Sequence, residues 1–238
     1  MKVSDIAKMI DHSLLHPTVS DKDIKEGCRL ALEYNVASVC VKPYAVSIAK
    51  EILYGSDVAI GTVVGFPHGN SRIEVKALEA EMALEDGAVE LDMVVNIGKV
   101  ISGDWDYVKK EINMLSYVTH MKGGILKVIF ENDFLSKDEL KIKLCKICSE
   151  AKADFVKTST GYGFVKQGNG FYSYKGAVAG DVVLMRKNSA GDIKIKAAGG
   201  VRTLDELLKF KELGVDRVGA SATKEILEEA KQCFGDGE

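Results

Sequence analysis

The chain has 238 residues and a mass of 25.8 kDa, the size of one large domain or two small ones. Its 32 basic and 35 acidic side chains give a formal net charge of −3, which argues against binding of nucleic acid through bulk charge. Hydrophobic residues make up 46% and charged residues 28% of the chain, so general disorder is excluded.

The sequence shows no signal for a membrane or for export. No apolar run approaches the ~18 residues of a membrane-spanning helix, and the N-terminal segment carries charges throughout. The five cysteines are an odd number without a secretory signal, which favours reduced thiols over a disulfide framework. We therefore expect a cytoplasmic protein without a membrane partner.

Short apolar runs alternate with amphipathic helical segments along the chain. The predicted strands are residues 9–13, 36–41, 58–65, 88–95, 125–130, 154–158, 193–198 and 215–221. The predicted helices are residues 20–34, 44–53, 71–86, 105–120, 136–151, 177–186, 203–213 and 224–233. Three helix starts are predicted by capping residues: Ser20, Ser136 with Glu139, and Thr203 with Glu206.

Strands that alternate with helices form a parallel sheet, and eight such repeats in a chain of this length are typical of a (β/α)₈ barrel. The alternative is an open, doubly wound sheet, which a Gly-x-Gly-x-x-Gly sequence at the first helix would favour. That sequence is missing there, and Gly161-Tyr162-Gly163 lacks the third glycine. We therefore predict an α/β fold, a (β/α)₈ TIM barrel that forms a single domain over residues 1–238.

Several predicted strands carry a charged or reactive residue where a buried parallel strand is usually Val, Ile or Leu. These residues are Asp11, Cys40, Asp92, Lys127, Glu131, Lys157 and Lys196. In a barrel the C-terminal ends of the strands meet at one face, which carries the active site. Asp92, Lys157 and Lys196 would come from the fourth, sixth and seventh strands and could point into one mouth.

The alternation of side chains does not by itself place Lys196 inside the barrel. Lys194 is expected to extend to solvent, and Lys196 follows on the same side unless the strand ends or bulges between them. Two lysines on solvated strands therefore remain an alternative to a pocket shared by Lys157 and Lys196.

A shared pocket would have a specific chemistry. A lysine is an ammonium at neutral pH, but a second ammonium nearby and partial desolvation lower its pKa and favour the amine. The amine attacks a carbonyl to form a Schiff base, and the protonated imine accepts the electrons of an adjacent carbon–carbon bond. Two such lysines, with Asp92 relaying protons through a water, would form the site of a class I aldolase.

Two glycine-containing turns form a second group of candidates. Gly199 and Gly200 follow the seventh predicted strand, and Gly219 and Ser221 lie at the end of the eighth. Barrels often bind a phosphate with backbone N–H groups of these two loops and a helix N-terminus. The glycines could also serve only to form tight turns.

The sequence argues against a metal site. His12 and His16 have the H-x-x-x-H spacing, but His12 lies in the predicted strand 9–13 and not on a metal-binding helix. Cys145 and Cys148 lie on a predicted helix face without a second cysteine pair, which favours packing over metal binding. A metal-dependent class II aldolase is therefore disfavoured.

The chain resembles deoxyribose-phosphate aldolases, which are class I aldolases on a (β/α)₈ barrel. The similarity runs nearly end to end and includes Ile10-Asp11-His12-Ser13-Leu14-Leu15, Gly65-Phe66-Pro67-His68-Gly69 and Glu90-Leu91-Asp92-Met93-Val94. The most specific pair of motifs is Lys157-Thr158-Ser159-Thr160-Gly161 with Lys196-Ala197-Ala198-Gly199-Gly200-Val201-Arg202-Thr203.

The resemblance implies a role for each candidate residue. Lys157 would be the Schiff-base lysine, Lys196 the second lysine that tunes it, and Asp92 the carboxylate of the proton relay. Cys40 and Asp11 would line the substrate pocket. The phosphate-binding turns would contain Gly161, Gly199, Gly200, Gly219 and Ser221.

The reaction that the resemblance implies is reversible cleavage of 2-deoxy-D-ribose 5-phosphate to acetaldehyde and D-glyceraldehyde 3-phosphate. It needs neither a metal nor an organic cofactor. The implied partners are small molecules, a sugar phosphate and an aldehyde, and the barrel would be a homodimer or a higher homo-oligomer.

The chain also departs from the family pattern. Tyr162 stands where many members carry Lys or Phe, and the loop from Gly163 to Gly176 is longer than in many members. Two alternatives therefore stay open. One is a Schiff-base aldolase for a different sugar phosphate, with this loop as a specificity element, and the other is a non-catalytic barrel that senses a sugar phosphate.

Overall fold

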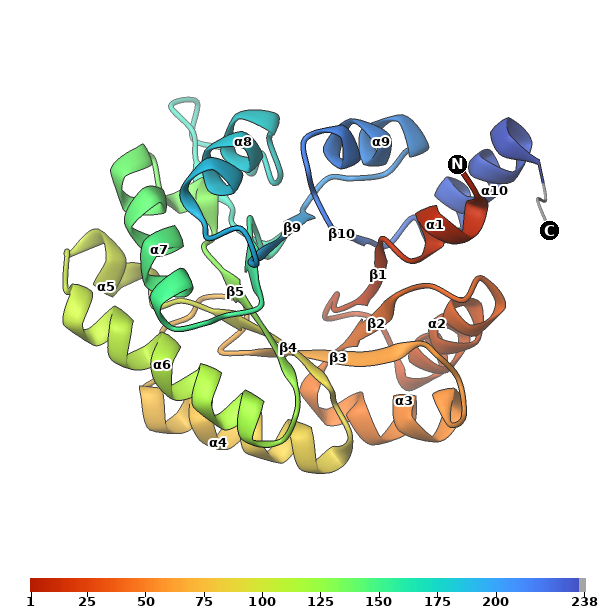
Figure 1. The fold of residues 1–238 in the computed structure, drawn as a ribbon, viewed down its shortest axis with the longest axis horizontal. Coiled ribbons are helices and arrows are strands. Elements are labelled where there is room, and N and C mark those ends of the chain that lie inside the picture. The colour runs from red at the N-terminus through yellow and green to blue at the C-terminus, as the bar shows by residue number, and fades with distance from the viewer. Residues whose placement is uncertain (236–238) are drawn as a thin grey trace.

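Each strand is a short run of apolar and β-branched residues that ends at a turn. In the computed structural model, which describes residues 1–235, eight parallel strands close into a barrel (Figure 1). Their order around the barrel is β1-β10-β9-β6-β5-β4-β3-β2. The strands are β1 (Ile10–Leu14), β2 (Ser38–Val41), β3 (Ala59–Val64), β4 (Glu90–Val94), β5 (Ile125–Ile129), β6 (Phe155–Lys157), β9 (Lys194–Ala198) and β10 (Arg217–Ala220). The predicted barrel is confirmed.

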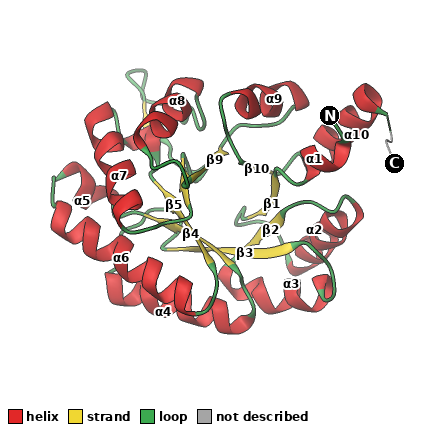
Figure 2. Cartoon of the chain, viewed as in Figure 1, coloured by secondary structure: helices red, strands yellow, loops and turns green. Residues whose placement is uncertain are grey.

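Helices form a ring outside the strands (Figure 2). They are α1 (Val3–Ala7), α2 (Asp21–Glu33), α3 (Val46–Leu53), α4 (Ile73–Asp86), α5 (Ile97–Ile101), α6 (Trp105–Met121), α7 (Asp138–Glu150), α8 (Ala179–Asn188), α9 (Leu204–Glu212) and α10 (Thr223–Phe234), with short 3₁₀ turns η1 (Pro43–Ala45) and η2 (Asn132–Phe134). Within residues 1–235, none of these helices is long and apolar enough to cross a membrane.

Two of the three predicted helix starts are confirmed. The Ser20 hydroxyl caps α2, and Thr203 forms a capping box with Glu206 at the start of α9. The prediction for α7 is wrong, because this helix begins at Asp138, after Lys137 as its N-cap residue. There the acidic side chains of Asp138 and the residue after it complement the helix dipole in place of a Ser136 cap.

Four elements differ from the prediction because they are too short for a periodic pattern. The helices α1 and α5 have five residues each. Within the segment predicted as an irregular loop, β7 (Val165–Lys166) pairs with β8 (Tyr172–Ser173) as an antiparallel hairpin. This hairpin lies beyond the C-terminal end of β6, in the connection that leads to α8.

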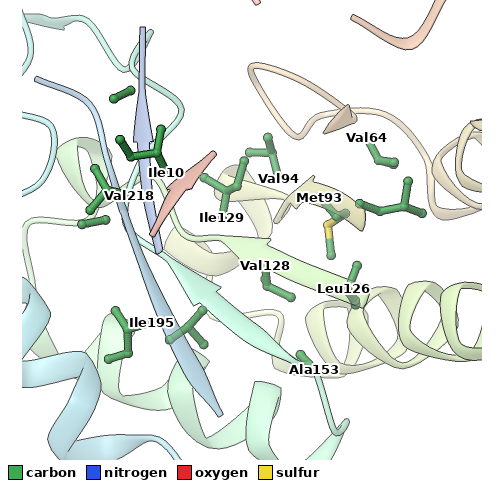
Figure 3. Packing of buried hydrophobic residues seen from close by; sticks show 14 of the residues in the cluster. Ile10, Val64, Met93, Val94, Leu126, Val128, Ile129, Ala153, Ile195 and Val218 are labelled. Carbon is green, nitrogen blue, oxygen red and sulfur yellow. The ribbon is translucent and has the colours of Figure 1, made fainter. Parts of the chain in front are cut away.

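The outer side of the strands carries the apolar core. Leu126 and Val128 on β5, Ile195 on β9 and Val218 on β10 are fully buried and pack in the layer between strands and helices (Figure 3). Burial of this layer is the main stabilising term of the fold. The inner side is different, since buried charged residues take the place of aliphatic ones there.

The structure settles the side on which Lys196 lies. Lys194 and Lys196 share the inner side of β9, as strand alternation requires. Lys194 lies at the N-terminal opening, exposed, with its ammonium 5.6 Å from the Phe155 ring centroid. Lys196 lies deeper and is 1% exposed. The two lysines therefore lie on the same side of β9 and differ only in their depth along the barrel axis.

Candidate active site

A cavity of about 410 Å³ opens where the C-terminal ends of the strands meet. It brings together nine of the predicted site residues: Asp11, Cys40, Lys157, Gly161, Lys196, Gly199, Gly200, Gly219 and Ser221. The tenth, Asp92, lies beside the two lysines and is fully buried. Residues from β1, β2, β4, β6, β9 and β10 thus meet at one end of the barrel, where barrel enzymes carry their active sites.

One carboxylate oxygen joins the two lysines. Asp92 Oδ2 accepts a hydrogen bond from Lys157 Nζ at 2.6 Å and another from Lys196 Nζ at 2.7 Å. The residues Lys157 and Lys196 are paired in register on neighbouring strands, and Asp92 reaches them from β4. A proton can therefore pass between the two amines through a single oxygen atom.

A second layer of charges lies beneath this group. Lys127 Nζ donates hydrogen bonds to Asp11 at 2.7 Å and to Glu90 at 2.6 Å, and it lies 3.5 Å from Asp92 Oδ1. Arg217 Nη1 donates to Asp11 Oδ1 at 2.6 Å. Sequence reasoning missed Glu90 and Arg217 as site residues. Their signal is spacing, because each lies two positions before an inner residue on its own strand.

The buried network contains more cations than anions when every group is ionised. Its four basic side chains, Lys127, Lys157, Lys196 and Arg217, face the three carboxylates of Asp11, Glu90 and Asp92. An unbalanced charge in a low-dielectric interior is costly, so one lysine as the neutral amine gives the balanced state.

The pKa shifts identify this lysine. Burial lowers the pKa of Lys157, and the ammonium of Lys196 acts in the same direction, so that the two together outweigh the opposing charge of Asp92. Burial also opposes the charge on Lys196, but Asp11, at 2.5 Å, and Asp92 raise its pKa. Burial opposes the charge on Asp92 too, yet three surrounding lysines hold the pKa of this carboxyl well below its usual range. Lys157 is therefore the group that most readily becomes the amine.

Cys40 belongs to an apolar wall beside the lysines. It packs with Leu15, Val63, Phe66 and Tyr162, and the Phe66 and Tyr162 rings meet edge to face at 5.5 Å. Burial, with the Asp92 charge, raises the pKa of the Cys40 thiol to about 11. The cysteine is thus a small uncharged part of the wall at neutral pH.

The opposite end of the cavity suits an anion. Gly199 and Gly200 have φ angles of +91° and +87°, which side-chain-bearing residues rarely adopt. The N-cap residue of α10 is Ala222, whose side chain makes no capping hydrogen bond. The N-terminus of α10, next to Ser221, therefore presents N–H groups without a side-chain cap and a positive dipole end.

Aromatic residues that sequence reasoning left without a role also line the cavity. Phe164 and Tyr174 come from the two ends of the β7–β8 hairpin segment, and their rings meet edge to face at 5.1 Å. The turn after β5 holds both ends of this segment. The Glu131 carboxylate accepts hydrogen bonds from the backbone N–H and hydroxyl of Thr160, and Asp133 accepts from the N–H groups of residues 175 and 176 at 2.6 and 2.9 Å.

Replacement of Lys127 by Met is expected to destabilise the protein by about 3–5 kcal/mol, because it leaves buried carboxylates without their cation. Urea unfolding of Lys127→Met beside wild type measures this free energy. Lys146→Met, which removes an exposed lysine on α7, is the control and is expected to change little. Equal unfolding midpoints for Lys127→Met and Lys146→Met would contradict the network.

Comparison with known proteins agrees with the site. A family model described as DeoC/LacD family aldolase matches residues 6–227. The chain is 49% identical to a deoxyribose-phosphate aldolase of Rhodopirellula baltica, over 97% of the chain and 91% of that protein. It is 47% identical to a deoxyribose-phosphate aldolase of Thermococcus gammatolerans, over 96% of the chain and 98% of that protein.

Solved structures show the same similarity. The deoxyribose phosphate aldolase of Aeropyrum pernix, described as having a unique tetrameric structure, superposes with a TM-score of 0.86 and 28% identity, covering 98% of this chain and 94% of that one. The aldolase QR15 superposes with a TM-score of 0.86 and 36% identity, covering 96% of both chains. The chain belongs to the DeoC/LacD family of aldolases.

Proposed function

We propose that this protein is a class I aldolase that reversibly cleaves 2-deoxy-D-ribose 5-phosphate to acetaldehyde and D-glyceraldehyde 3-phosphate. The observation that carries the proposal is the Asp92 oxygen shared by Lys157 and Lys196 at one end of a cavity whose other end is lined by the glycine turns and Ser221. This arrangement supports an amine, a proton relay and a phosphate site in one enclosure. Family membership makes the protein a carbon–carbon lyase.

In the first stage the Lys157 amine attacks the C1 aldehyde of the open-chain sugar. The resulting carbinolamine loses its hydroxyl as water, which takes a proton supplied by the Lys196 ammonium through Asp92. The product is a protonated imine that holds the substrate covalently. The lowered pKa of Lys157 makes the free amine more available for this attack than the amine of an ordinary lysine.

In the second stage the bond between C2 and C3 breaks. Asp92, through a water, takes the proton of the C3 hydroxyl, and the bonding electrons move into the iminium to give an enamine. D-Glyceraldehyde 3-phosphate leaves with C3 as its aldehyde carbon. A proton returns from Asp92 to C2. Water at C1 then releases acetaldehyde and the free Lys157 amine, and the proton set free in this hydrolysis returns through Asp92 to Lys196.

The direct test is incubation of the purified protein with 2-deoxy-D-ribose 5-phosphate, with acetaldehyde measured as it forms. Borohydride added during turnover is expected to reduce the imine and leave a stable adduct on Lys157, which peptide mass spectrometry locates. Rapid acetaldehyde release with the adduct on another lysine would overturn the assignment. Saturable binding without any product would instead favour the sensor.

The phosphate site has a separate test at Ser221. A carboxylate introduced by Ser221→Asp would repel the substrate phosphate, so kcat/KM for 2-deoxy-D-ribose 5-phosphate is expected to fall about 100-fold, as charge pairs of this kind are worth a few kcal/mol. Ser221→Asn is the neutral control of equal size. Cleavage of unphosphorylated 2-deoxy-D-ribose should be unaffected by Ser221→Asp, and equal losses on both sugars would argue against phosphate binding there.

A second substrate is favoured by one observation, the hairpin aromatics Phe164 and Tyr174 at the cavity. These rings replace solvent along one wall and could select a sugar phosphate of different length or stereochemistry. A panel of phosphorylated aldoses, assayed for cleavage products, separates this alternative from the first. Faster turnover of another member of the panel would identify the preferred substrate.

We further propose that the enzyme works in the cytoplasm as a homo-oligomer. The five free cysteines, of which Cys28, Cys40, Cys145 and Cys148 are buried, support a reducing compartment. The tetrameric description of the Aeropyrum pernix relative supports self-association. Apart from its own copies, the proposed partners are the small-molecule substrate and products.

A further inference from the structure

The start of α10 is held differently from the start of α9, the other helix that follows a glycine-containing turn at the cavity. The hydroxyl of Thr203 caps α9 by accepting a hydrogen bond from the backbone N–H of Glu206. The N-cap residue of α10 is Ala222, which has no side-chain oxygen for this purpose. A capping oxygen would occupy an N–H group that an anion could use, so an uncapped start suits an anion but leaves the helix start without its usual anchor.

His12 provides an anchor from outside the helix. Its ring nitrogen Nδ1 lies 2.8 Å from the hydroxyl oxygen of Thr223, the first residue of α10. Both side chains are buried, with exposed fractions of 6% for His12 and 0% for Thr223. At the first position of a helix no earlier helical turn offers a carbonyl to a threonine hydroxyl, so this hydroxyl is available to the imidazole.

The same residue lies beside the other end of this connection. β1 and β10 are neighbours in the barrel (Figure 1), and His12 is in register with Ala220, the last residue of β10. Only Ser221 and Ala222 separate Ala220 from Thr223. His12 therefore holds both ends of a two-residue connection, residues 221–222, which we call the Ser221 turn.

Strand β1 also joins the Ser221 turn to the buried lysines. Consecutive side chains of a strand point to opposite sides, so Asp11 faces the barrel interior while His12 faces α10. Asp11 forms ion pairs with Lys127 at 2.7 Å and with Lys196 at 2.5 Å. Two adjacent residues of one strand thus fix where the Ser221 turn lies relative to Lys196.

The imidazole of His12 is uncharged at neutral pH. Burial lowers its pKa to about 4, although the charge of Glu225 acts in the opposite direction. A neutral ring has one nitrogen that donates and one that accepts, so it can bond to the Thr223 hydroxyl in either sense. The anchor therefore needs no buried charge between β1 and α10, which would be costly.

We propose that His12 is a positioning residue for the substrate phosphate: through Thr223 it holds the uncapped start of α10, and with it the Ser221 turn, in the arrangement that receives the phosphate. This inference rests on the phosphate site of the proposed function. The cavity is lined by Ser221 but not by His12 or Thr223, so these two residues act through the turn and not by touching the substrate. A turn that is ordered in advance binds an anion more tightly, because binding does not have to order it.

Thr223→Val removes the hydroxyl and keeps the shape of the side chain. We expect kcat/KM for 2-deoxy-D-ribose 5-phosphate to fall about tenfold, mainly through KM, because a hydrogen bond that orders the turn is lost. The inhibition constant of inorganic phosphate should rise by the same factor, and cleavage of unphosphorylated 2-deoxy-D-ribose should not change. Thr223→Ser keeps the hydroxyl and should behave as wild type.

Thr119→Val on α6 is the matched control for Thr223→Val. Thr119 is also 0% exposed, and its hydroxyl donates a hydrogen bond to the Leu115 carbonyl at 2.6 Å, outside the cavity. This variant therefore loses a buried hydroxyl and one hydrogen bond as well. It is expected to keep the wild-type kcat/KM on both sugars and the wild-type inhibition constant of inorganic phosphate.

A double-mutant cycle tests whether His12 acts through Thr223. His12→Leu is expected to cause the same loss as Thr223→Val, and the double variant should show no further loss. His12→Asn keeps a polar atom at the position of Nδ1 and should lose less than His12→Leu. Additive losses in the double variant would show that the two residues act separately, which contradicts the proposal.

This inference and the proposed function fail in different ways. If the wild type cleaves the sugar phosphate but Thr223→Val changes neither sugar, or both equally, His12 only packs and the aldolase function stands. If the wild type does not cleave it, the proposed function fails, and calorimetric titration with inorganic phosphate still compares the wild type with Thr223→Val. Equal Kd values, or no binding to either protein, would then overturn the role of His12. Circular dichroism verifies folding, and His12→Leu replaces Thr223→Val if that variant unfolds.

Discussion

Lys157→Ala is expected to lose at least about 10⁴-fold in kcat/KM for 2-deoxy-D-ribose 5-phosphate, because the covalent route disappears with the amine. The phosphate turns and the charge network stay in place, so the variant should still bind the substrate. Acetaldehyde release over a long incubation measures the loss, and borohydride treatment should leave the chain without a reduced adduct.

The control for this variant is Lys194→Ala. Lys194 lies on the inner side of the same barrel but at the N-terminal opening, remote from the cavity that contains Lys157. It should keep wild-type turnover and form the adduct on Lys157. Activity of Lys157→Ala within tenfold of wild type would show that this lysine is not the nucleophile.

Lys196→Leu is expected to shift the pH dependence of kcat/KM and to lower kcat/KM at neutral pH. The ammonium of Lys196 keeps the pKa of Lys157 low and donates a hydrogen bond to the same Asp92 oxygen as Lys157. When this ammonium is removed, the Asp92 carboxylate stabilises the charged form of Lys157. The pKa of Lys157 should therefore rise. Since only the amine attacks, the acidic limb of the profile should move to higher pH. Activity at neutral pH should fall about tenfold for each pH unit by which the acidic limb moves.

Lys196→Arg retains the positive charge and is expected to keep the acidic limb near its wild-type position, with a lower rate because arginine does not relay protons. Activity of Lys196→Leu should recover in part at alkaline pH. A Lys196→Leu profile with an unmoved limb and lower activity at every pH would assign Lys196 to positioning alone.

The sequence predicts the barrel because each strand is an apolar run between turn residues, and this signal is local. It misses α1 and α5, which span about one turn each and show no period. It does not place Lys196 in the cavity, because alternation shows only on which side of the strand a residue lies relative to its neighbours in sequence. The depth at which a residue lies depends on how far the strands are staggered when the sheet closes.

The sequence does not predict the charge network beneath Lys157 and Lys196, for the same reason. Lys127 is an unusual strand residue in the sequence, but its contacts join Asp11, 116 positions away, and Glu90, 37 positions away. Pairings across the inside of a barrel leave no trace in local periodicity. The roles of the predicted site residues remain predictions, and the variants of Lys157, Lys196 and Ser221 test them.

The two carboxylates that hold the hairpin segment have a consequence for the evolution of substrate range. Glu131 and Asp133 bind its two ends from one turn, so the residues between them can change in length and composition without displacing Lys157. The tip near Asn169 contacts solvent and not the charge network. We therefore expect that exchange of this segment between relatives alters the sugar that is accepted and leaves the chemistry of the Lys157 amine unchanged.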